Sequence, residues 1–415
     1  MVRGVFPQNK APRWGICFVF TPIRKMVYNF FMIIRRAYRY RFYPSQQQRI
    51  QLAQTFGCSR FVYNWALRLR TDAYYQHQQK MSYKETSNQL TNLKKNPDFV
   101  WLKDVTAVPL QQALRHLNTA FLNFFSGRAK YPKFKKKRNK QSVTYASNAF
   151  KWDGEKLTLA KMKSPLKIRW HRHFTGIPTT VTVNKDSANR YFVSFSVEEE
   201  IEQLPQNDEQ VAIDLGIKDV IVSSKGFASG NPKYYQKYQK KLAKLQKRLA
   251  KKQKGSKNRD KARLKVAKLH AKIADCRLDF LNKLTIQLIR ENQVVITESL
   301  FVKNMIKNHK LAKAIADVAW GELIRQLDYK ASWYGRILIQ VDRFFPSSKR
   351  CHACGHVLDK LPLEIREWDC VCGSHNLRDY NAALNLLAVG RTVLAYGDTS
   401  VGDTAIALSS QVSSK

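Results

Sequence analysis

Four of the seven cysteines in this 415-residue chain lie within one stretch of twenty-two positions. Cys351 and Cys354 have the C-x-x-C spacing that lets two thiolates grip one zinc ion in a tight turn. Cys370 and Cys372 are separated by one residue only, so the second pair is contracted. The cluster predicts one Zn²⁺ bound by four thiolates, and a chance cluster of reduced thiols is the alternative. If the short pair cannot close, the spare ligands are His352, His356 and His375.

Three acidic residues stand in or at the ends of predicted strands or at the start of a predicted helix, where they could form a catalytic site. Asp214 lies in the apolar run VAIDLGI, Glu298 lies in VVITESL, and Asp379 stands at the head of a helix-like segment after the cysteines. An unpaired carboxylate in a strand covered on both faces is costly unless a cation accompanies it. Three such groups meeting at the end of a mixed sheet could hold two Mg²⁺ ions for in-line attack on a phosphodiester. The alternative is that each is an ordinary strand-end acid beside a basic neighbour.

A third feature is the segment RAKYPKFKKKRNK, residues 128–140, in which eight of thirteen residues are basic. Like charges this dense cannot pack together, so the segment is either a solvated loop or lies on phosphates. The interleaved aromatic rings favour nucleic acid, because rings stack on unpaired bases. The predicted contacts are Tyr131, Lys133, Phe134, Lys135, Lys136, Lys137 and Arg138.

The overall charge points to the same class of partner. The chain has 73 Lys and Arg against 31 Asp and Glu, a formal net charge of +42. A compact body with that charge repels itself unless a polyanion neutralises it, so nucleic acid is the expected partner. A ribosomal or histone-like structural role remains an alternative. An acidic membrane is disfavoured, since no basic amphipathic helix of the peripheral type stands out.

Neither membrane insertion nor a disulfide framework is expected. The most apolar stretch, residues 17–34, is interrupted by Arg24 and Lys25 and is too short in uninterrupted length for a membrane span. The three remaining cysteines are scattered singly, at positions 17, 58 and 276. Single cysteines beside one cluster indicate a reduced cytosolic protein with one metal site.

The elements that would position these residues follow from hydrophobic periodicity. Alternation predicts a strand over 37–43, and helical spacing follows to about Gly127, with Gly57 as a break between two helices. A second helical pair is predicted over 83–95 and 107–125, and it fits either a DNA-binding helix-turn-helix or bundle core. Between 142 and 200 the period falls to two, which predicts a small antiparallel barrel or sheet joined by the first strand.

The second half alternates strands and helices. Two strands are predicted around Gly216, followed by a hairpin of long helices over 233–253 and 259–291 with an apolar seam. The run NQVVITESL predicts a buried strand, 310–334 predicts a helix, and RILIQVDRFFP predicts another strand.

Several of these stretches, taken together, resemble one family. The blocks RAYRYRFYPS, GCSRFVYNWAL, AVPLQQALRHLNTAFLNFF, YPKFKKKRNKQSV, AIDLGIKD, DRFFPSSKRCHACG and RDYNAALN look like successive blocks of the TnpB (OrfB) proteins of bacterial insertion sequences. The resemblance runs from about Met32 to Leu387. It implies an RNA-guided DNA endonuclease with a RuvC-like (RNase H-fold) domain, related to the type V CRISPR effectors. The implied partners are a guide RNA from the element's own end and double-stranded target DNA.

The resemblance also implies residue roles. Asp214, Glu298 and Asp379 would be the catalytic triad that holds two Mg²⁺ ions, and the four clustered cysteines would be the ligands of a zinc ribbon. The chain departs from the family pattern in its contracted second cysteine pair and at Leu377, where an Asp is usual. The expected location is the bacterial cytoplasm, in association with the nucleoid.

The expected fold is α+β and multidomain. A helical recognition insert interrupts a small β-barrel wedge domain, and a RuvC-like mixed α/β nuclease domain with an inserted zinc ribbon follows. The expected ranges are an N-terminal extension or mis-called start (1–31), the wedge (32–44 and 128–205), the helical insert (45–127), the nuclease domain (209–345 and 376–390), the ribbon (346–375) and a flexible tail (391–415).

Three functions compete. The first is guided, Mg²⁺-dependent DNA cleavage that supports maintenance or transposition of the element. The second is a guided DNA-binding regulator that no longer cuts, against which the three intact carboxylates argue. The third is a transposase acting directly in recombination, for which no nucleophile stands out in the sequence.

Overall fold

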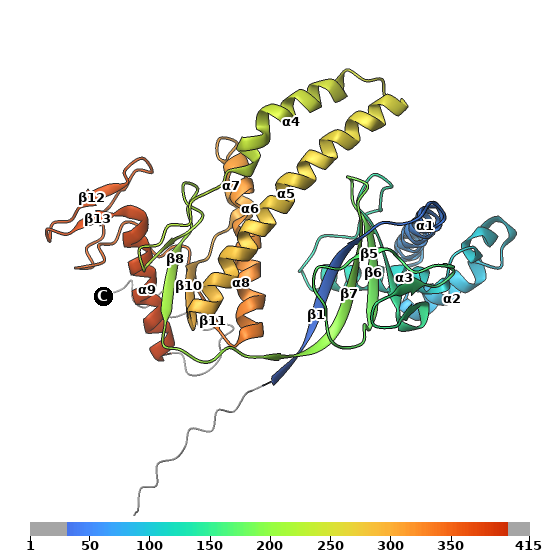
Figure 1. Cartoon of the computed structure of the whole chain (residues 1–415), viewed down its shortest axis with the longest axis horizontal. Coiled ribbons are helices and arrows are strands. Elements are labelled where there is room, and N and C mark those ends of the chain that lie inside the picture. Colours follow the sequence, from blue (N-terminus) through green and yellow to red (C-terminus); the bar gives the residue numbers. More distant parts are fainter. Residues whose placement is uncertain (1–30, 397–415) are drawn as a thin grey trace, which may run out of the picture.

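Two β-sheets organise residues 31–396, the part of the chain that the computed structural model describes. Figure 1 shows one sheet in each half of the molecule, with the chain after β7 (Tyr191–Glu202) running between the halves to β8 (Gln210–Asp214). Apart from Phe31, the predicted N-terminal extension lies outside the described residues, as does the predicted tail beyond Tyr396.

The first sheet is five-stranded and antiparallel, in the order β2-β6-β7-β1-β5. Its other strands are β1 (Phe31–Phe42), β2 (Gln141–Ala146), β5 (Ile168–Arg169) and β6 (Thr180–Lys185). The strand predicted over 37–43 is confirmed but begins six residues earlier, because β1 pairs with β7 along its whole length. A separate pair, β3 (Phe150–Trp152) and β4 (Leu157–Leu159), packs against the same core.

This sheet is open. Within residues 31–396, β2 and β5 are its two edges and do not pair with each other, so the predicted closed barrel is wrong and the alternative, a sheet, is correct. Alternate side chains of β1, including Tyr38, Tyr40 and Phe42, point into one core, while Arg39 and Arg41 lie on the opposite face. The helix that starts after Ser45 covers the core side with Leu52 and Phe56.

The helical insert consists of α1 (Gln46–His77), α2 (Tyr83–Leu93), a 3₁₀ turn (Pro97–Lys103) and α3 (Ala107–Phe125). The predicted break at Gly57 is wrong, because α1 is continuous. Phe56 packs on the sheet core and Val62 on the bundle core, so contacts on both sides of Gly57 outweigh its helix penalty of about 1 kcal/mol. The second helical pair is confirmed, and its apolar faces form bundle core.

The second sheet is mixed, in the order β11-β10-β8-β9. The strands β10 (Val294–Glu298) and β11 (Ile337–Val341) run parallel to β8, and β9 (Val222–Ser223) is antiparallel to it. Helix α9 (Arg378–Tyr396) covers one face, while α5 (Lys257–Glu291) and α8 (Trp320–Tyr334) cover the other. Gly390 lets α9 approach closely, because a Cβ there would lie 2.5 Å from Ile296 Cδ1.

Two predicted boundaries around this sheet need correction. The helix predicted over 310–334 is broken at Ala319, which has φ 59°, into α7 (Ala312–Val318) and α8. The break lets both Val318 and Trp320 enter the core. The predicted tail from 391 begins too early, because α9 continues to Tyr396 and packs Val393 and Leu394 against the sheet. A short helix, α6 (Val302–Met305), lies between β10 and α7.

The predicted hairpin is confirmed as α4 (Tyr234–Ala250) packed against α5, and Figure 1 shows the pair extending away from the body. Leu242, Leu269 and Ile273 form its buried seam. No helix in the part of the chain described combines the length and apolar character needed to cross a membrane.

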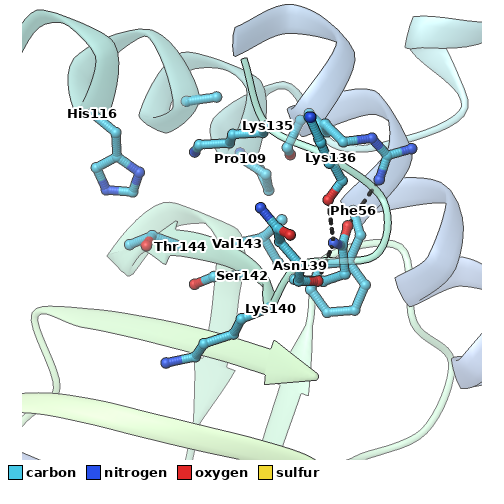
Figure 2. Close-up of a pocket in the computed structure, with 14 residues that line it drawn as sticks. Phe56, Pro109, His116, Lys135, Lys136, Asn139, Lys140, Ser142, Val143 and Thr144 are labelled. Atoms are coloured by element: carbon cyan, nitrogen blue, oxygen red, sulfur yellow. Dashed lines mark hydrogen bonds between the residues drawn. The ribbon is translucent and has the colours of Figure 1, made fainter. Parts of the chain in front are cut away.

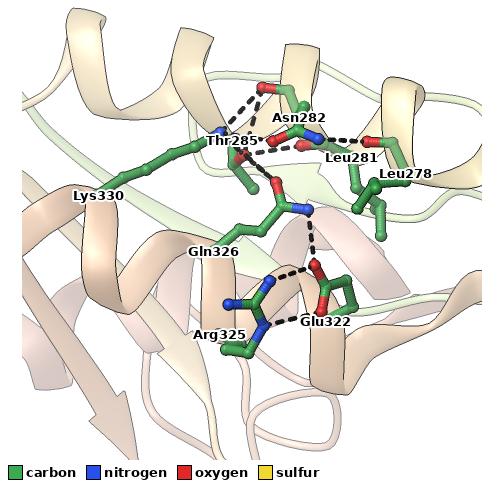
Figure 3. A network of polar contacts seen from close by, with 8 residues as sticks. All are labelled: Leu278, Leu281, Asn282, Thr285, Glu322, Arg325, Gln326 and Lys330. Carbon is green, nitrogen blue, oxygen red and sulfur yellow. Dashed lines mark hydrogen bonds and ion pairs between the residues drawn. The ribbon is translucent and has the colours of Figure 1, made fainter. Parts of the chain in front are cut away.

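A buried lysine joins α5 to α8, as Figure 3 shows. Lys330 Nζ donates to Thr285 Oγ1 at 2.7 Å and to the Asn282 carbonyl at 3.1 Å. Burial lowers the pKa of Lys330 to about 8, although the nearby Glu322 opposes this. No periodicity signals this network, because it depends on two helices that are distant in sequence.

Candidate active site and metal centre

Asp214 and Glu298 end two neighbouring parallel strands at the same edge of the mixed sheet. The pairing of β8 with β10 aligns Ile213 with Thr297, so the two acids follow directly in register. Ala212 and Ile296, two residues earlier, face α9, and side chains of a strand alternate between its faces. Both carboxylates therefore lie on the side of the sheet that α9 covers.

Asp379 reaches this edge from α9. It is the second residue of that helix, where the exposed backbone N–H groups and the helix dipole favour a negative charge. Arg366 Nη1 lies 3.5 Å from Asp379 Oδ1. The structure thus brings together three acids that span 165 positions of the sequence, from Asp214 to Asp379.

Asp214 lies within the electrostatic influence of the other two acids. Burial raises the pKa of Asp214 well above its usual range, and the charges of Glu298 and Asp379 raise it further, against Arg378 and Arg366. Burial also raises the pKa of Glu298 to about 7, although a hydrogen bond from the Leu215 backbone opposes this. No side chain between Phe31 and Tyr396 donates a hydrogen bond to the Asp214 carboxylate. Carboxylates desolvated in this way are suited to cations.

The distances between the carboxylate oxygens of these three acids matter for the number of metal ions that they could hold. Among the described residues, only the four cysteines form a cluster whose ligand atoms all lie within 4.8 Å of one another. The three carboxylates are therefore more widely spread than that cluster. Two ions of a two-metal site lie about 3.5–4 Å apart, so a set of ligands shared between them can be spread in this way.

The four clustered cysteines could hold a metal ion such as zinc. Cys351 Sγ lies 3.8 Å from Cys372 Sγ, and Cys354 Sγ lies 3.5 Å from Cys370 Sγ. With Zn–S bonds of about 2.3 Å, the edge of a tetrahedron of sulfurs is about 3.8 Å long. The contracted pair closes in a turn in which Gly373, at φ 83°, has the left-handed conformation that suits glycine.

The histidines lie outside this cluster. His375 Nδ1 lies 2.7 Å from Asp369 Oδ1, and its other nitrogen lies 3.6 Å from Glu367, on the exposed side of the hairpin formed by β12 (Glu367–Asp369) and β13 (His375–Leu377). His352 Nδ1 lies 3.0 Å from Asn376 Oδ1. The geometry favours four sulfur ligands over a set in which a histidine replaces a thiolate. Leu377, at the departure from the family pattern, is exposed.

Two asparagines that were not among the predicted site residues join the ribbon, which carries the four cysteines, to α9. Asn381 Oδ1 accepts the backbone N–H of His352 at 2.9 Å, and its amide donates to the Arg350 carbonyl at 2.7 Å. Asn385 donates to the carbonyls of Ser347 and Arg350, at 2.9 and 2.6 Å. Both side chains are buried. The two asparagines follow Asp379 in the run RDYNAALN and are four residues apart, a spacing that places them on one face of a helix. The sequence therefore contained a signal for this pair.

The basic segment lies far along the chain from these sites, between α3 and β2, in the half that contains the first sheet. Two of the residues predicted to contact nucleic acid also make contacts within the protein. The Tyr131 hydroxyl lies 2.7 Å from Thr71 Oγ1, and Lys135 Nζ lies 4.0 Å from the centre of the Tyr63 ring. Burial lowers the pKa of Lys135, although part of its side chain is exposed. The other predicted contacts are exposed, as Tyr131 and Lys135 also are in part: Lys133, Phe134, Lys136, Lys137 and Arg138.

A cavity of about 260 Å³ separates this segment from α1, α3 and β2. Figure 2 shows Lys135 and Lys136 at the top of the view, His116 at its left and Lys140 below them, all four lining the cavity. Burial, followed by the charge of Lys135, lowers the pKa of His116. The lining contains no acidic side chain, so the cavity could accept an anionic group.

Comparison with protein families gives three matches along the chain. Residues 193–309 match the OrfB_IS605 family, described as "Probable transposase", and residues 320–386 match a "Cas12f1-like, TNB domain". Residues 32–79 match a "Helix-turn-helix domain". In this structure, that last range contains β1 and the single continuous helix α1.

Two curated relatives match nearly the whole chain. A protein of Streptomyces pristinaespiralis named "Putative RNA-guided DNA endonuclease" is 50% identical, covering 88% of this chain and 92% of its own length. The Escherichia coli (strain K12) protein "Putative RNA-guided DNA endonuclease InsQ" is 32% identical, covering 88% of this chain and 94% of its own length.

A solved structure shares the fold. The Cas12f1 protein in a complex with single guide RNA and target DNA superimposes with a TM-score of 0.54, covering 85% of this chain and 98% of its own chain. The two sequences are 13% identical, so this match concerns the fold alone.

Proposed function

Because this chain belongs to the OrfB (TnpB) family of insertion-sequence proteins, we propose that it is a transposon-encoded RNA-guided DNA endonuclease. The proposal extends the names of its relatives to this chain. Its cleavage would support maintenance and transposition of the element that encodes it. The expected partners are a guide RNA from the element's own end and a double-stranded DNA target.

One observation carries the nuclease activity: Asp214 is a desolvated carboxylate beside two further carboxylates, at the edge of a sheet in a strongly basic protein. Such an arrangement is costly without cations. Asp214, Glu298 and Asp379 would hold two Mg²⁺ ions, which supply an activated water and stabilise the leaving oxygen of a phosphodiester. The chain's own contribution is to orient the three carboxylates from two strands and one helix. Arg366 and Arg378 supply positive charge beside the same edge.

In this proposal, residues 209–345 and 376–390 form a RuvC-like nuclease domain. The ribbon, residues 346–375, would hold one zinc ion through its four cysteines. Asn381 and Asn385 would fix the ribbon to the helix that carries Asp379. The ribbon therefore lies where it could guide a strand toward the carboxylates. The first sheet and the helical insert, residues 32–205, would form the wedge and recognition domains.

The deciding experiment is programmed cleavage. The protein is expressed together with its element's end, the co-purifying RNA is sequenced, and a plasmid matching that RNA is offered with Mg²⁺. Cleavage at the matching site by wild-type protein, and none by Asp214→Ala, is the expected result. Guided binding without cleavage by the wild type would overturn the nuclease in favour of a DNA-binding regulator. Recombined products without a guide would indicate a transposase that acts directly.

A further inference from the structure

The outer part of the α4–α5 hairpin is the most one-sidedly charged element outside the sites already described. Between Lys240 and Lys265, thirteen of twenty-six residues are Lys or Arg, and Asp260 is the only acid. All of these basic side chains except Arg259 are exposed. Within this stretch, which we call the arm, the only ion pair joins Arg263 to Asp260.

The charges are arranged in continuous surfaces. One face of α4 forms a shallow groove lined by Lys240, Lys244, Lys247, Arg248 and Lys251. A second groove lies between the two helices near the tip and shares Arg248 and Lys251 with the first. The two grooves together form one basic surface that follows the arm.

Repulsion between these like charges destabilises the two helices of the arm when no partner is bound. Lysines four residues apart, such as Lys240 and Lys244 or Lys247 and Lys251, are neighbours on a helix surface and repel each other. Acidic partners return only where α5 approaches the body, at Asp275 with Arg190 and at Asp279 with Lys283. The repulsion in the arm is therefore relieved best by an external polyanion.

The composition of the arm also indicates which part of a nucleic acid it meets. From Gln239 to Asp279 the chain contains no Phe, Tyr or Trp. Binding of unpaired bases uses aromatic stacking, whereas contacts to phosphates need only cations and carry no sequence information. In the basic segment 128–140, by contrast, aromatic rings are interleaved with the cations.

We propose that the arm binds the phosphate backbone of double-helical nucleic acid. The inference rests on the proposed function only in taking RNA and DNA as the partners. Two sources offer this chemistry, a folded part of the guide RNA and the duplex between guide and target strand. Both present the regular backbone that rows of lysines can follow.

The test measures binding without Mg²⁺, so that cleavage plays no part. The variant replaces Lys240, Lys244, Lys247 and Lys251 by Gln, which is nearly as good a helix former, and circular dichroism checks that the helix content is kept. A matched control replaces four exposed lysines elsewhere: Lys84, Lys95, Lys151 and Lys156. The probes are a 20-base-pair RNA duplex, a 20-base-pair RNA–DNA hybrid and a 20-nucleotide oligouridylate.

For a duplex, each lost phosphate contact reduces the magnitude of the slope of log affinity against log salt by roughly 0.9. The slope of the four-lysine variant should therefore be smaller than that of wild type by about 3–4, and the slope of the control should change much less. A loss of slope on both duplexes supports the proposal; a larger loss on the RNA duplex favours a folded part of the guide RNA as the source, and a larger loss on the hybrid favours the duplex between guide and target strand. Unchanged slopes on both duplexes, an equal loss in the control, or an equal loss on oligouridylate would overturn the proposal. None of these outcomes depends on cleavage, which is measured separately.

Discussion

Asp214 and Glu298 end adjacent parallel strands, and the backbone amide that follows Asp214 at Leu215 lies against the Glu298 carboxylate. Two acids are thus held at one sheet edge by strand register, independently of any ion. Their proximity is built into the hydrogen-bonded ladder, so the electrostatic cost of the site is present before a cation binds.

Asp214→Asn should stabilise the metal-free protein, because it removes an acid whose ionised form is disfavoured by desolvation and by the charges of Glu298 and Asp379. The expected gain is about 1–3 kcal/mol in the free energy of unfolding. Added Mg²⁺ should raise the melting temperature of wild type more than that of the variant. Thermal melting with a chelator and with Mg²⁺ measures both effects, with the exposed Asp208→Asn as the control. A variant less stable than wild type without metal would contradict this account of the site.

Replacing Lys136, Lys137 and Arg138 by Gln should weaken binding of the guide RNA and lower its salt dependence. Each lost contact reduces the log–log slope by roughly 0.7–0.9. Lys135→Gln should act differently, because this ammonium is desolvated against Tyr63. It should lower the melting temperature more and the slope less than any one of the other three changes. An unchanged slope in the triple variant would mean that the segment is a solvated loop.

Cys372→Ser should abolish stoichiometric zinc binding, since all four sulfurs lie within 4.8 Å of one another and could surround one ion. His375→Ala should retain the metal, because His375 pairs with Asp369 and Glu367 outside the cluster. Elemental analysis of the purified variants decides the matter. If Cys372→Ser kept its zinc and His375→Ala lost it, His375 rather than Cys372 would be the fourth ligand.

Asn385→Ala should loosen the ribbon without removing its ligands. The change leaves the carbonyls of Ser347 and Arg350 without this donor, at a cost of about 1–3 kcal/mol. We expect a lower melting temperature and faster loss of zinc to a chelator, at unchanged initial stoichiometry. Asn92→Ala, at an exposed helical position, is the matched control. Equal rates of zinc loss in the two variants would argue against this connection.

Lys330→Met should remove a pH dependence from stability. The pKa of Lys330 is about 8 in the folded protein against an ordinary 10.5, so the unfolded chain binds the proton more tightly between these values. The free energy of unfolding of wild type should therefore rise relative to the variant from pH 8 to 10.5, by up to roughly 3 kcal/mol. Urea unfolding at pH 7.5 and 10 measures it, with the exposed Lys303→Met as the control. Parallel responses of wild type and Lys330→Met would refute the shift.

Most of the secondary structure could be predicted from the sequence, because it depends on local periodicity. The seam of the α4–α5 hairpin and the strands that end at Asp214 and Glu298 were recognisable from residues close together in the chain. The errors lie where packing overrides local preference. Gly57 remains inside α1, because its neighbours enter two cores, and Ala319 breaks a helix so that Trp320 can be buried.

The candidate site divides in the same way. The sequence alone determined which residue types were available, since four cysteines and three acids in apolar or helix-start contexts are local features. Only the tertiary structure decided that the contracted cysteine pair closes, that His375 pairs with Asp369 away from the sulfurs, and that Asn381 and Asn385 hold the ribbon on α9. It also decided that Lys135 is partly desolvated. These outcomes depend on contacts between residues far apart in the chain, whose distances and burial no local pattern encodes.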